Sequence, residues 1–421
     1  MKRNIVILLI IISFGACHKD EIDNIQKDDD GIFVSLSYHW KKSLHENNVF
    51  HSNSYFKTPI QYENNIAIPT TDANGKRYFT MINLDNGETV WQWNDIEDLS
   101  TDYIDISYAY IYNNLLTFQK GGWSLCINLK TGTTYWKLLR DNSFHAKISG
   151  LNNTYYSFGN TNQYSDYNIK VGHKGDIQTG EIEEFLEPKF SFEYSIGNRM
   201  CDVTEIVPYE IDGINHLVVV YQELASSSIW NFQSFLGLYN EETNEWVYER
   251  KIMNEPNLNG VSLAPPVIYN NMFYANIGHE LICHNISTGE QVWKRQFTQD
   301  FMFSGFIIED DKIIANNEDL TLYCLDPETG GTIWTGEGAG TCSRMSYLNG
   351  IVYFVGGGDS RFHAVDIETG ETVWRLDAKK LEDSEGRFKT NAVYVIPSES
   401  GDKGKVIALT HMYDYCFEAY Q

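Results

Sequence analysis

The chain has 421 residues, of which 42% are hydrophobic and 14% aromatic, enough for a substantial core. Its 32 basic residues are outnumbered by 57 acidic ones, which gives a formal net charge of −25. Such a surface repels phosphate backbones, and no stripe of lysine and arginine offsets it, so we expect no nucleic-acid partner. The 27 tyrosines, 22 phenylalanines and 10 tryptophans favour strands.

The first residues have the layout of an export signal. Lys2-Arg3 precedes an apolar stretch over residues 5–14, which is too short to span a bilayer, and two small residues then lead to Cys17. This resembles a bacterial lipoprotein signal, in which residues 1–16 are removed and Cys17 carries the lipid. The alternative is an ordinary secretory signal with a chance cysteine.

Residues 17–31 form a polar, acidic run that we interpret as a flexible tether between Cys17 and a folded body over 32–421. The run resembles the export signal that some Bacteroidetes lipoproteins carry after the lipidated cysteine. That resemblance implies the outer membrane, with exposure on the cell surface. The alternative is a solvated linker without an address.

A repeat dominates the rest of the chain. Most copies have an Asp/Asn-x-x-Thr-Gly turn, which reverses the chain, and then a strand that carries a large aromatic residue. These aromatic residues, which we call anchors, follow one another at intervals of 40 to 61 residues. Full copies end at Trp91, Trp136, Trp293, Trp334 and Trp374, and degenerate copies end at Phe185 and at Trp246, where two residues of the repeat are missing. We interpret all of them as packing between repeats.

A period of this length with short strands predicts an all-β propeller of four-stranded blades. Seven copies are visible, and residues 388–420 contain three further strands without a turn or a tryptophan. The segment 33–40, which ends in Trp40, is expected to supply their fourth strand and so to close the ring and remove open sheet edges. We therefore predict eight blades, with seven as the alternative.

The turn-and-tryptophan repeat resembles that of quinoprotein (pyrroloquinoline-quinone, PQQ) propellers over residues 32–420, and the chain looks most like the propeller lipoproteins of the outer-membrane barrel-assembly machinery. Enzymes with this repeat hold the quinone over the central channel with calcium and, in alcohol dehydrogenases, a disulfide between adjacent cysteines. No two cysteines are adjacent here. We therefore expect no bound quinone, no other cofactor and no metal.

The other cysteines have a simpler interpretation. Cys126, Cys283 and Cys324 precede their turns at the position where another copy has Ala364, and Cys416 matches them in the last blade. We interpret them as small apolar residues in crowded strands. Cys201 and Cys342 lie in other strands, and whether either forms a disulfide is left open.

Three residues outside the repeat are candidate binding residues. Trp123 and Trp230 precede the third strands of their blades, near hairpin tips on one face of the ring, where they would stack on a sugar, contact a protein, or pack against a neighbouring loop. Arg344 is expected in an innermost strand, lining the channel or paired with an acid there.

No constellation of catalytic residues stands out, and we predict that the protein is not an enzyme. The leading hypothesis is an outer-membrane lipoprotein that acts as a scaffold and binds envelope proteins through the faces of the propeller. The alternative is a surface lipoprotein that binds cell-surface glycans, and the least favoured is an enzyme with a site in the propeller funnel. In each case the membrane is reached through the lipid anchor alone.

Overall fold

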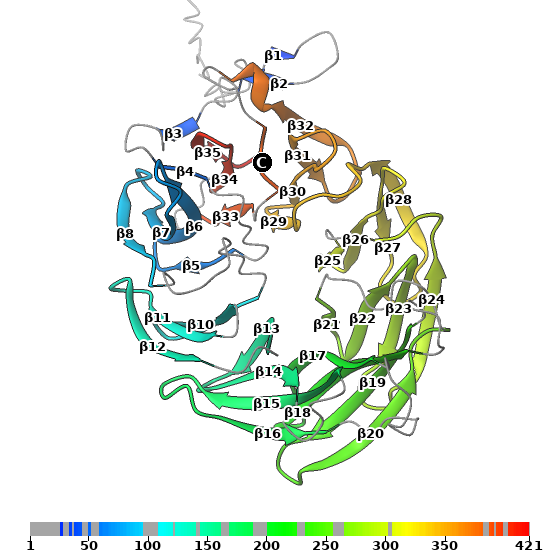
Figure 1. Cartoon of the computed structure of the whole chain (residues 1–421). Coiled ribbons are helices and arrows are strands. Elements are labelled where there is room, and N and C mark those ends of the chain that lie inside the picture. The colour runs from blue at the N-terminus through cyan, green and yellow to red at the C-terminus, as the bar shows by residue number, and fades with distance from the viewer. Residues whose placement is uncertain are drawn as a thin grey trace, which may run out of the picture.

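The computed structural model shows a ring of eight β-blades around a central axis (Figure 1). The structure describes residues 26–27, 33–35, 38–43, 49–51, 59–95, 108–120, 123–139, 144–160, 168–187, 200–224, 232–255, 265–301, 305–381, 387–390, 393–398 and 403–420. In this part of the chain no helix has the length and apolarity needed to cross a membrane. The prediction of an eight-bladed propeller is confirmed, and the seven-blade alternative is wrong.

The first four blades contain strands β4 to β20. In blade 1 the inner position is shared by two short strands: β4 (Val49–His51), β5 (Gln61–Tyr62), β6 (Asn65–Asp72), β7 (Arg77–Asn83) and β8 (Thr89–Trp93). Blade 2 has β9 (Tyr110–Tyr112), β10 (Leu115–Lys120), β11 (Trp123–Asn128) and β12 (Thr133–Leu139). Blade 3 has β13 (Phe144–Leu151), β14 (Thr154–Asn160), β15 (Asn168–Asp176) and β16 (Ile182–Leu186). Blade 4 has β17 (Met200–Ile211), β18 (Ile214–Leu224), β19 (Phe232–Asn240) and β20 (Glu245–Ile252).

The remaining blades are more regular. Blade 5 has β21 (Val267–Tyr269), β22 (Met272–Ile277), β23 (Glu280–Asn285) and β24 (Gln291–Gln296). Blade 6 has β25 (Phe306–Glu309), β26 (Lys312–Asn316), β27 (Thr321–Leu325) and β28 (Thr332–Glu337). Blade 7 has β29 (Ser346–Leu348), β30 (Ile351–Val355), β31 (Arg361–Asp366) and β32 (Thr372–Asp377), followed by the short 3-10 helix η3 (Ala378–Lys380). Blade 8 has β33 (Tyr394–Ile396), β34 (Lys405–Leu409), β35 (Tyr413–Glu418) and, from the other end of the chain, β3 (Tyr38–Ser43).

The N-terminal strand closes the ring as expected, but its bounds differ. β3 pairs antiparallel with β35, so that Trp40 lies opposite Cys416. The earlier part of the predicted strand forms β2 (Phe33–Ser35), which pairs with β1 (Gln26–Lys27) and meets blade 7 where Phe33 is the parallel partner of Leu376. β2 is thus attached to blade 7, and β3 to blade 8.

Blades 3 and 4 are joined more closely than the others. Asn168 and Ile169 of β15 pair in parallel with Met200 and Cys201 of β17, which makes one continuous sheet of the two blades. These are also the blades in which the repeat is degenerate. Because a sheet already connects them, their junction depends less on an anchor that packs across it.

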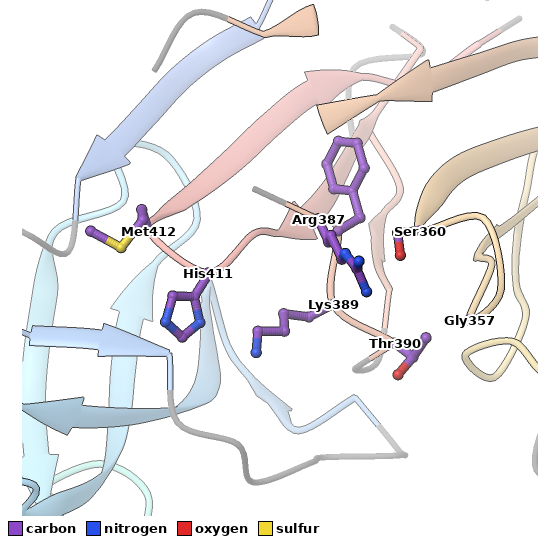
Figure 2. A pocket seen from close by; sticks show the side chains of 8 residues that line it. Gly357, Ser360, Arg387, Lys389, Thr390, His411 and Met412 are labelled. Atoms are coloured by element: carbon purple, nitrogen blue, oxygen red, sulfur yellow. The ribbon is translucent and has the colours of Figure 1, made fainter. Parts of the chain in front are cut away.

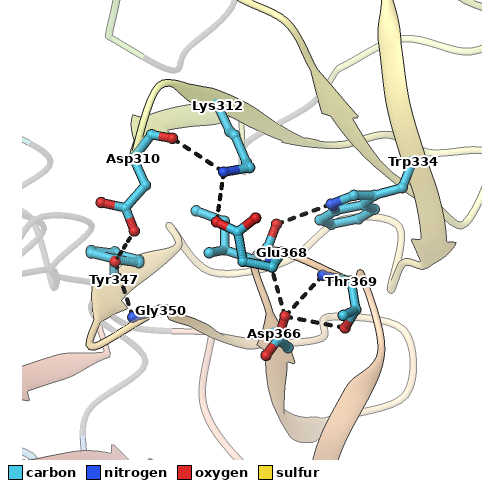
Figure 3. A network of polar contacts seen from close by, with 9 residues as sticks. Asp310, Lys312, Trp334, Tyr347, Gly350, Asp366, Glu368 and Thr369 are labelled. Atoms are coloured by element: carbon cyan, nitrogen blue, oxygen red, sulfur yellow. Dashed lines mark hydrogen bonds and ion pairs between the residues drawn. The ribbon is translucent and has the colours of Figure 1, made fainter.

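The repeat turns explain how neighbouring blades hold together, as the junction of blades 6 and 7 shows (Figure 3). Asp366 Oδ1 accepts hydrogen bonds from the backbone N–H groups of Glu368 and Thr369 at 2.9 and 2.8 Å, which fixes the turn. Trp334 of the preceding blade donates its indole N–H to the carbonyl of Ile367 in this turn at 2.9 Å. The turn of one blade is therefore the socket for the anchor of the blade before it.

The same contact recurs around the ring. The indole N–H donates to the carbonyl at the matching turn position in the pairs Trp40 to Leu84, Trp91 to Leu129, Trp136 to Ile177 and Trp293 to Pro327, at 2.8 to 2.9 Å. In each of these pairs, the turn glycine lies against the indole of the tryptophan that donates to its turn. At Gly370, whose φ is +74°, a Cβ atom would lie only 2.5 Å from Cε3 of Trp334. Glycine is therefore needed there both for the left-handed backbone and for the close approach of the indole.

The junctions without a Trp–turn pair use other aromatic contacts. Trp374 of blade 7 faces blade 8, which has no repeat turn, and packs edge-on against Phe362 at 5.1 Å within a buried cluster that includes Phe417. Phe185 of blade 3 meets Tyr239 of blade 4 at 6.1 Å. Both anchors therefore lie at blade junctions.

Blade 4 departs from the expectation. The Tyr248 hydroxyl, and not Trp246, reaches the turn of blade 5, where it donates to the Ile286 carbonyl at 2.6 Å. Trp246 packs back on its own sheet, where a Cβ on Gly237 would lie 2.5 Å from the indole ring. Tyr248 follows Thr243 by the five residues that separate Thr288 from Trp293, so no residue of this repeat is missing.

Strand register accounts for the cysteines. Cys126, Cys283, Cys324 and Cys416 lie directly across from Trp136, Trp293, Trp334 and Trp40, and Ala364 lies across from Trp374. All four thiols are free and buried, and burial raises the pKa of Cys126 and Cys416 to about 12. Met81 takes the same position opposite Trp91, so this site holds a small or flexible apolar side chain, which agrees with the interpretation of the cysteines as packing residues.

The two faces of the ring differ. Because strands alternate in direction within a blade, the turns that carry the repeat and the hairpins between first and second strands lie on one face, which we call the turn face. The hairpins between second and third strands, and the connections between blades, lie on the opposite face, which we call the loop face. The blade-to-blade connections, such as 94–109 and 378–393, are longer than the five-residue repeat turns.

Candidate functional site

A cluster of charged and aromatic side chains lies across the central channel. We call it the channel cluster: Tyr108 at the entry to blade 2, Lys147 in β13, Glu205 in β17, and Arg344 at the entry to blade 7. Lys147 Nζ forms an ion pair with a Glu205 carboxylate oxygen and lies 5.2 Å from the centre of the Tyr108 ring. The Arg344 guanidinium lies 5.1 Å from the same ring centre. Because blade 7 lies on the far side of the ring from blades 3 and 4, these contacts span the channel (Figure 1).

Burial sets the electrostatics of the channel cluster. It raises the pKa of Glu205, and the cations Lys147 and Arg344 only partly oppose this. Burial alone would lower the pKa of Lys147, but the Glu205 carboxylate and Tyr108 outweigh it, so that the pKa of Lys147 is raised. Burial also lowers the pKa of Arg344, although a guanidinium keeps its charge at any physiological pH. The cations therefore outnumber the acid at the centre of an otherwise acidic molecule.

This geometry is that of a structural cross-link. The Lys147–Glu205 pair ties the inner strands of blades 3 and 4, and the Ser149 hydroxyl donates to the Ile206 carbonyl beside it. Breaking a buried ion pair by removing one partner typically costs about 3 to 5 kcal/mol, because the other charge is left uncompensated. The pair therefore helps to hold the inner strands of blades 3 and 4 together.

The residues present do not fit a quinone with its calcium ion. A flat cofactor across the channel would have to separate Tyr108 from Lys147 and Arg344, which are in contact. Its calcium ion would need several oxygen ligands, but Glu205 is held by Lys147. In the described part of the chain, no three His, Cys, Asp or Glu side chains are placed to hold a metal together.

The structure places Arg344 two residues before β29, not within an innermost strand as expected. Its contact with Tyr108 nevertheless brings it into the channel cluster. Tyr108, Lys147 and Glu205 were not singled out from the sequence. Lys147 and Glu205 lie in the innermost strands of their blades, where a charged side chain indicates a paired or functional group. Their pairing could not be predicted, because only the ring brings the two strands together.

Trp123 begins β11 on the loop face, as expected from its place before a third strand. It is half-buried against the core between blades 1 and 2, and Lys137 Nζ lies 4.9 Å above its ring. Lys137 is in turn held by Asp95 at 3.1 Å. The ring face on which a sugar would stack is therefore covered by this cation.

Of the remaining candidate residues, the structure describes Cys342. Cys17 and Trp230 lie outside the described residues. The Cys342 thiol is buried, and its Sγ lies 3.0 Å from the Ser343 carbonyl oxygen, whereas the side chain of Cys201 is outside the described part.

Comparison with known proteins supports the interpretation of the repeat. Residues 229–339 and 287–411 match the model of a family described as outer membrane protein assembly factor BamB. These stretches contain the most regular repeats, with the anchors Trp293, Trp334 and Trp374. No curated protein matches the sequence as a whole.

Solved structures are similar to the entire ring. BamB from Moraxella catarrhalis superimposes with a TM-score of 0.55 at 11% identity, over 91% of this chain and 100% of that one. A quinohemoprotein alcohol dehydrogenase from Pseudomonas putida gives 0.61 at 10% identity, over 91% and 76% of the two chains. Sqt1 from Saccharomyces cerevisiae gives 0.57 at 8% identity, over 92% and 100%.

The superpositions establish the shared fold, but at identities this low they leave the activity open. The same fold occurs in a dehydrogenase and in BamB. Residues 229–411 match the BamB family model, and the described residues form an eight-bladed β-propeller whose repeats resemble those of PQQ propellers.

Proposed function

We propose that this protein is a non-enzymatic scaffold that docks an envelope protein on the loop face of its propeller. The observation that carries the proposal is the position of its most exposed large apolar side chains. Among the described residues these are Leu139, Leu320 and Ile252, which are 67%, 63% and 57% exposed. Leu139 ends β12, Ile252 ends β20, and Leu320 lies in the hairpin between β26 and β27, so all three belong to the loop face.

We infer a contact site from these side chains because covering exposed apolar groups with a partner recovers hydrophobic free energy. The three residues belong to blades 2, 4 and 6, which are spread around the ring (Figure 1). A partner that contacts all of them must be broad. This favours a folded protein domain over a small ligand, since a stable protein interface buries about 800 Å² on each side.

We further propose that the protein is held at the outer membrane by a lipid on Cys17, with residues 17–31 as the tether. The signal-like sequence over residues 1–17 supports the anchor, and the match to the BamB family model supports the membrane. A tether of this length lets the ring turn its loop face towards a partner in the same membrane.

The test replaces Leu139, Ile252 and Leu320 together by aspartate in the full-length lipoprotein. Exposed positions tolerate such changes within about 0.5 kcal/mol of unfolding free energy, so the ring should stay folded. Proteins that cross-link to the wild type in intact cells would be quantified by mass spectrometry. We expect the triple variant to lose its principal cross-linked partner at least tenfold.

The matched control carries aspartate at Val90, Val292 and Ile333, which are 50%, 48% and 49% exposed but lie in outer strands along the edge of the ring. It should keep the partner. Equal cross-linking in wild type and loop-face variant, or loss in the control alone, would show that the loop face is not the docking surface.

A further inference from the structure

A pocket of about 440 Å³ lies on the loop face between blades 7 and 8. The segment 387–390, which leads into blade 8, forms one wall, and the hairpins that follow β30 and β34 form the others. Its lining residues are Gly357, Ser360, Arg387, Phe388, Lys389, Thr390, His411 and Met412. Figure 2 shows Lys389 extending towards the side of His411, and the Arg387 guanidinium on the side of Ser360.

The backbone of this wall dictates which side chains enter the pocket. Phe388 is 3% exposed and packs against Phe362 at 5.7 Å and Tyr415 at 6.5 Å. Its backbone N–H donates to the Ser360 carbonyl, and the N–H of Lys389 donates to the Leu409 carbonyl at 2.8 Å. In extended chain, neighbours of an inward residue point the other way. Burying Phe388 therefore directs the two cations beside it to the pocket.

These two cations lack the partners that other cations of the ring have. Neither Arg387 nor Lys389 forms an ion pair with a carboxylate of the described residues, whereas Lys312, Lys405 and Arg375 each do. Asp359, the acid of the adjoining hairpin, accepts from His363 Nε2 at 2.9 Å and from the backbone N–H of Arg361 at 3.0 Å. In a chain of net charge −25, an uncompensated pair of cations in a concave site is unexpected.

Two further features suit a ligand. Ser360 lines the pocket with a φ of +58°, a left-handed conformation that residues other than glycine, asparagine and aspartate seldom adopt. Such strain is found preferentially at binding sites. Lys389 is half-buried, and burial lowers its pKa, so its ammonium is short of water and gains from a bound anion.

We propose that this pocket binds the phosphate group of a small phosphomonoester. A phosphate group carries two negative charges and several acceptor oxygens. It therefore matches two cations together with the hydroxyls of Ser360 and Thr390 and the imidazole of His411. A single carboxylate has one charge and two oxygens, too few to bind all of these groups. Met412 offers an apolar surface for the carbon skeleton of the ester. The volume is that of a small-molecule site. This proposal is independent of protein docking on the loop face.

The experiment measures binding of inorganic phosphate, glycerol 3-phosphate and glucose 6-phosphate to the full-length lipoprotein in detergent by titration calorimetry. We expect saturable binding of the two esters, and affinity for glucuronate at least about tenfold weaker. Replacing Lys389→Met or Arg387→Gln should each weaken ester binding about tenfold or more, because a charge-assisted hydrogen bond is lost. Lys130→Met, which removes an exposed lysine from a turn in blade 2, should change nothing.

A second measurement does not depend on the variants being folded. The esters should protect Lys389 of the wild type from acetylation, as detected by peptide mass spectrometry, and should leave Lys130 unprotected. Competition by phosphatidic acid vesicles would identify a lipid headgroup as the source of the phosphate, and competition by soluble esters alone would identify a free metabolite. No saturable ester binding, equal affinity for glucuronate, or no protection of Lys389 would overturn the proposal.

Discussion

At the scale of single residues, five of the eight blade junctions depend on a pairing of glycine and tryptophan. The turn glycine has a left-handed backbone and lies against the indole ring of the blade before it. These two requirements are separable, because Gly75 has a similar backbone, with φ of +82°, but no atom within 4 Å of where a Cβ would lie.

We therefore predict that Gly370→Ala destabilises the protein much more than Gly75→Ala. Gly75→Ala should cost about 1 kcal/mol, from the left-handed backbone alone. Gly370→Ala adds a clash with Trp334 and should cost about 3 kcal/mol or more, as for an overpacked core. Unfolding of the two variants in denaturant gives the comparison. Equal losses of stability would contradict the role assigned to the indole contact.

Residue-scale prediction from the sequence was accurate where spacing decided the matter. The repeat identified Trp91, Trp136, Trp293 and Trp334 as residues between blades because a turn and its tryptophan keep a constant offset. In blade 4 the same offset from the turn threonine indicates Tyr248. Trp246 is predicted only if the anchor is required to be a tryptophan. A tyrosine serves because its hydroxyl supplies the one hydrogen bond that the indole N–H makes elsewhere.

At the scale of elements, closure by β3 is the feature on which the ring depends most. β3 covers the open edge of β35, and Trp40 donates to the Leu84 carbonyl of blade 1, so one strand connects the last blade to the first. The sequence predicted this closure because three strands without a fourth lie at the C-terminal end of the chain and a single strand lies near the N-terminal end. It could not show where β2 ends and β3 begins, because apolar and polar residues alternate in a similar way in both segments.

We predict that a truncation which removes residues up to Ser43 opens the ring. Loss of Trp40 alone should cost about 3 to 5 kcal/mol of unfolding free energy. The bare edge of β35 should also pair with other copies, which size-exclusion chromatography would detect as oligomers. A truncation up to Gly31 leaves β2 and β3 in place and should unfold like the full chain. If both truncations unfold alike, β3 does not close the ring.

At the scale of the whole molecule, the formal charge of −25 does not favour contact with an anionic membrane surface, so the proposed membrane contact depends on the N-terminal segment. We predict that Cys17→Ser moves the protein from the membrane fraction to the soluble fraction of cells. The unchanged ring should keep its melting temperature, which serves as the control for folding. If the variant stays in the membrane fraction, Cys17 does not carry the anchor.

The sequence by itself determined the propeller, its eight blades, its closure and most of its anchors. Each of these follows from a pattern that repeats at a constant offset, because most blades make the same contact with the next. Only the tertiary structure decided the channel cluster and the pocket between blades 7 and 8. Tyr108 and Arg344 are more than 200 residues apart and meet only because the ring brings its inner edges together. The pocket is likewise built from connections that share no period, so its cations could not be recognised before the fold placed Phe388 in the core.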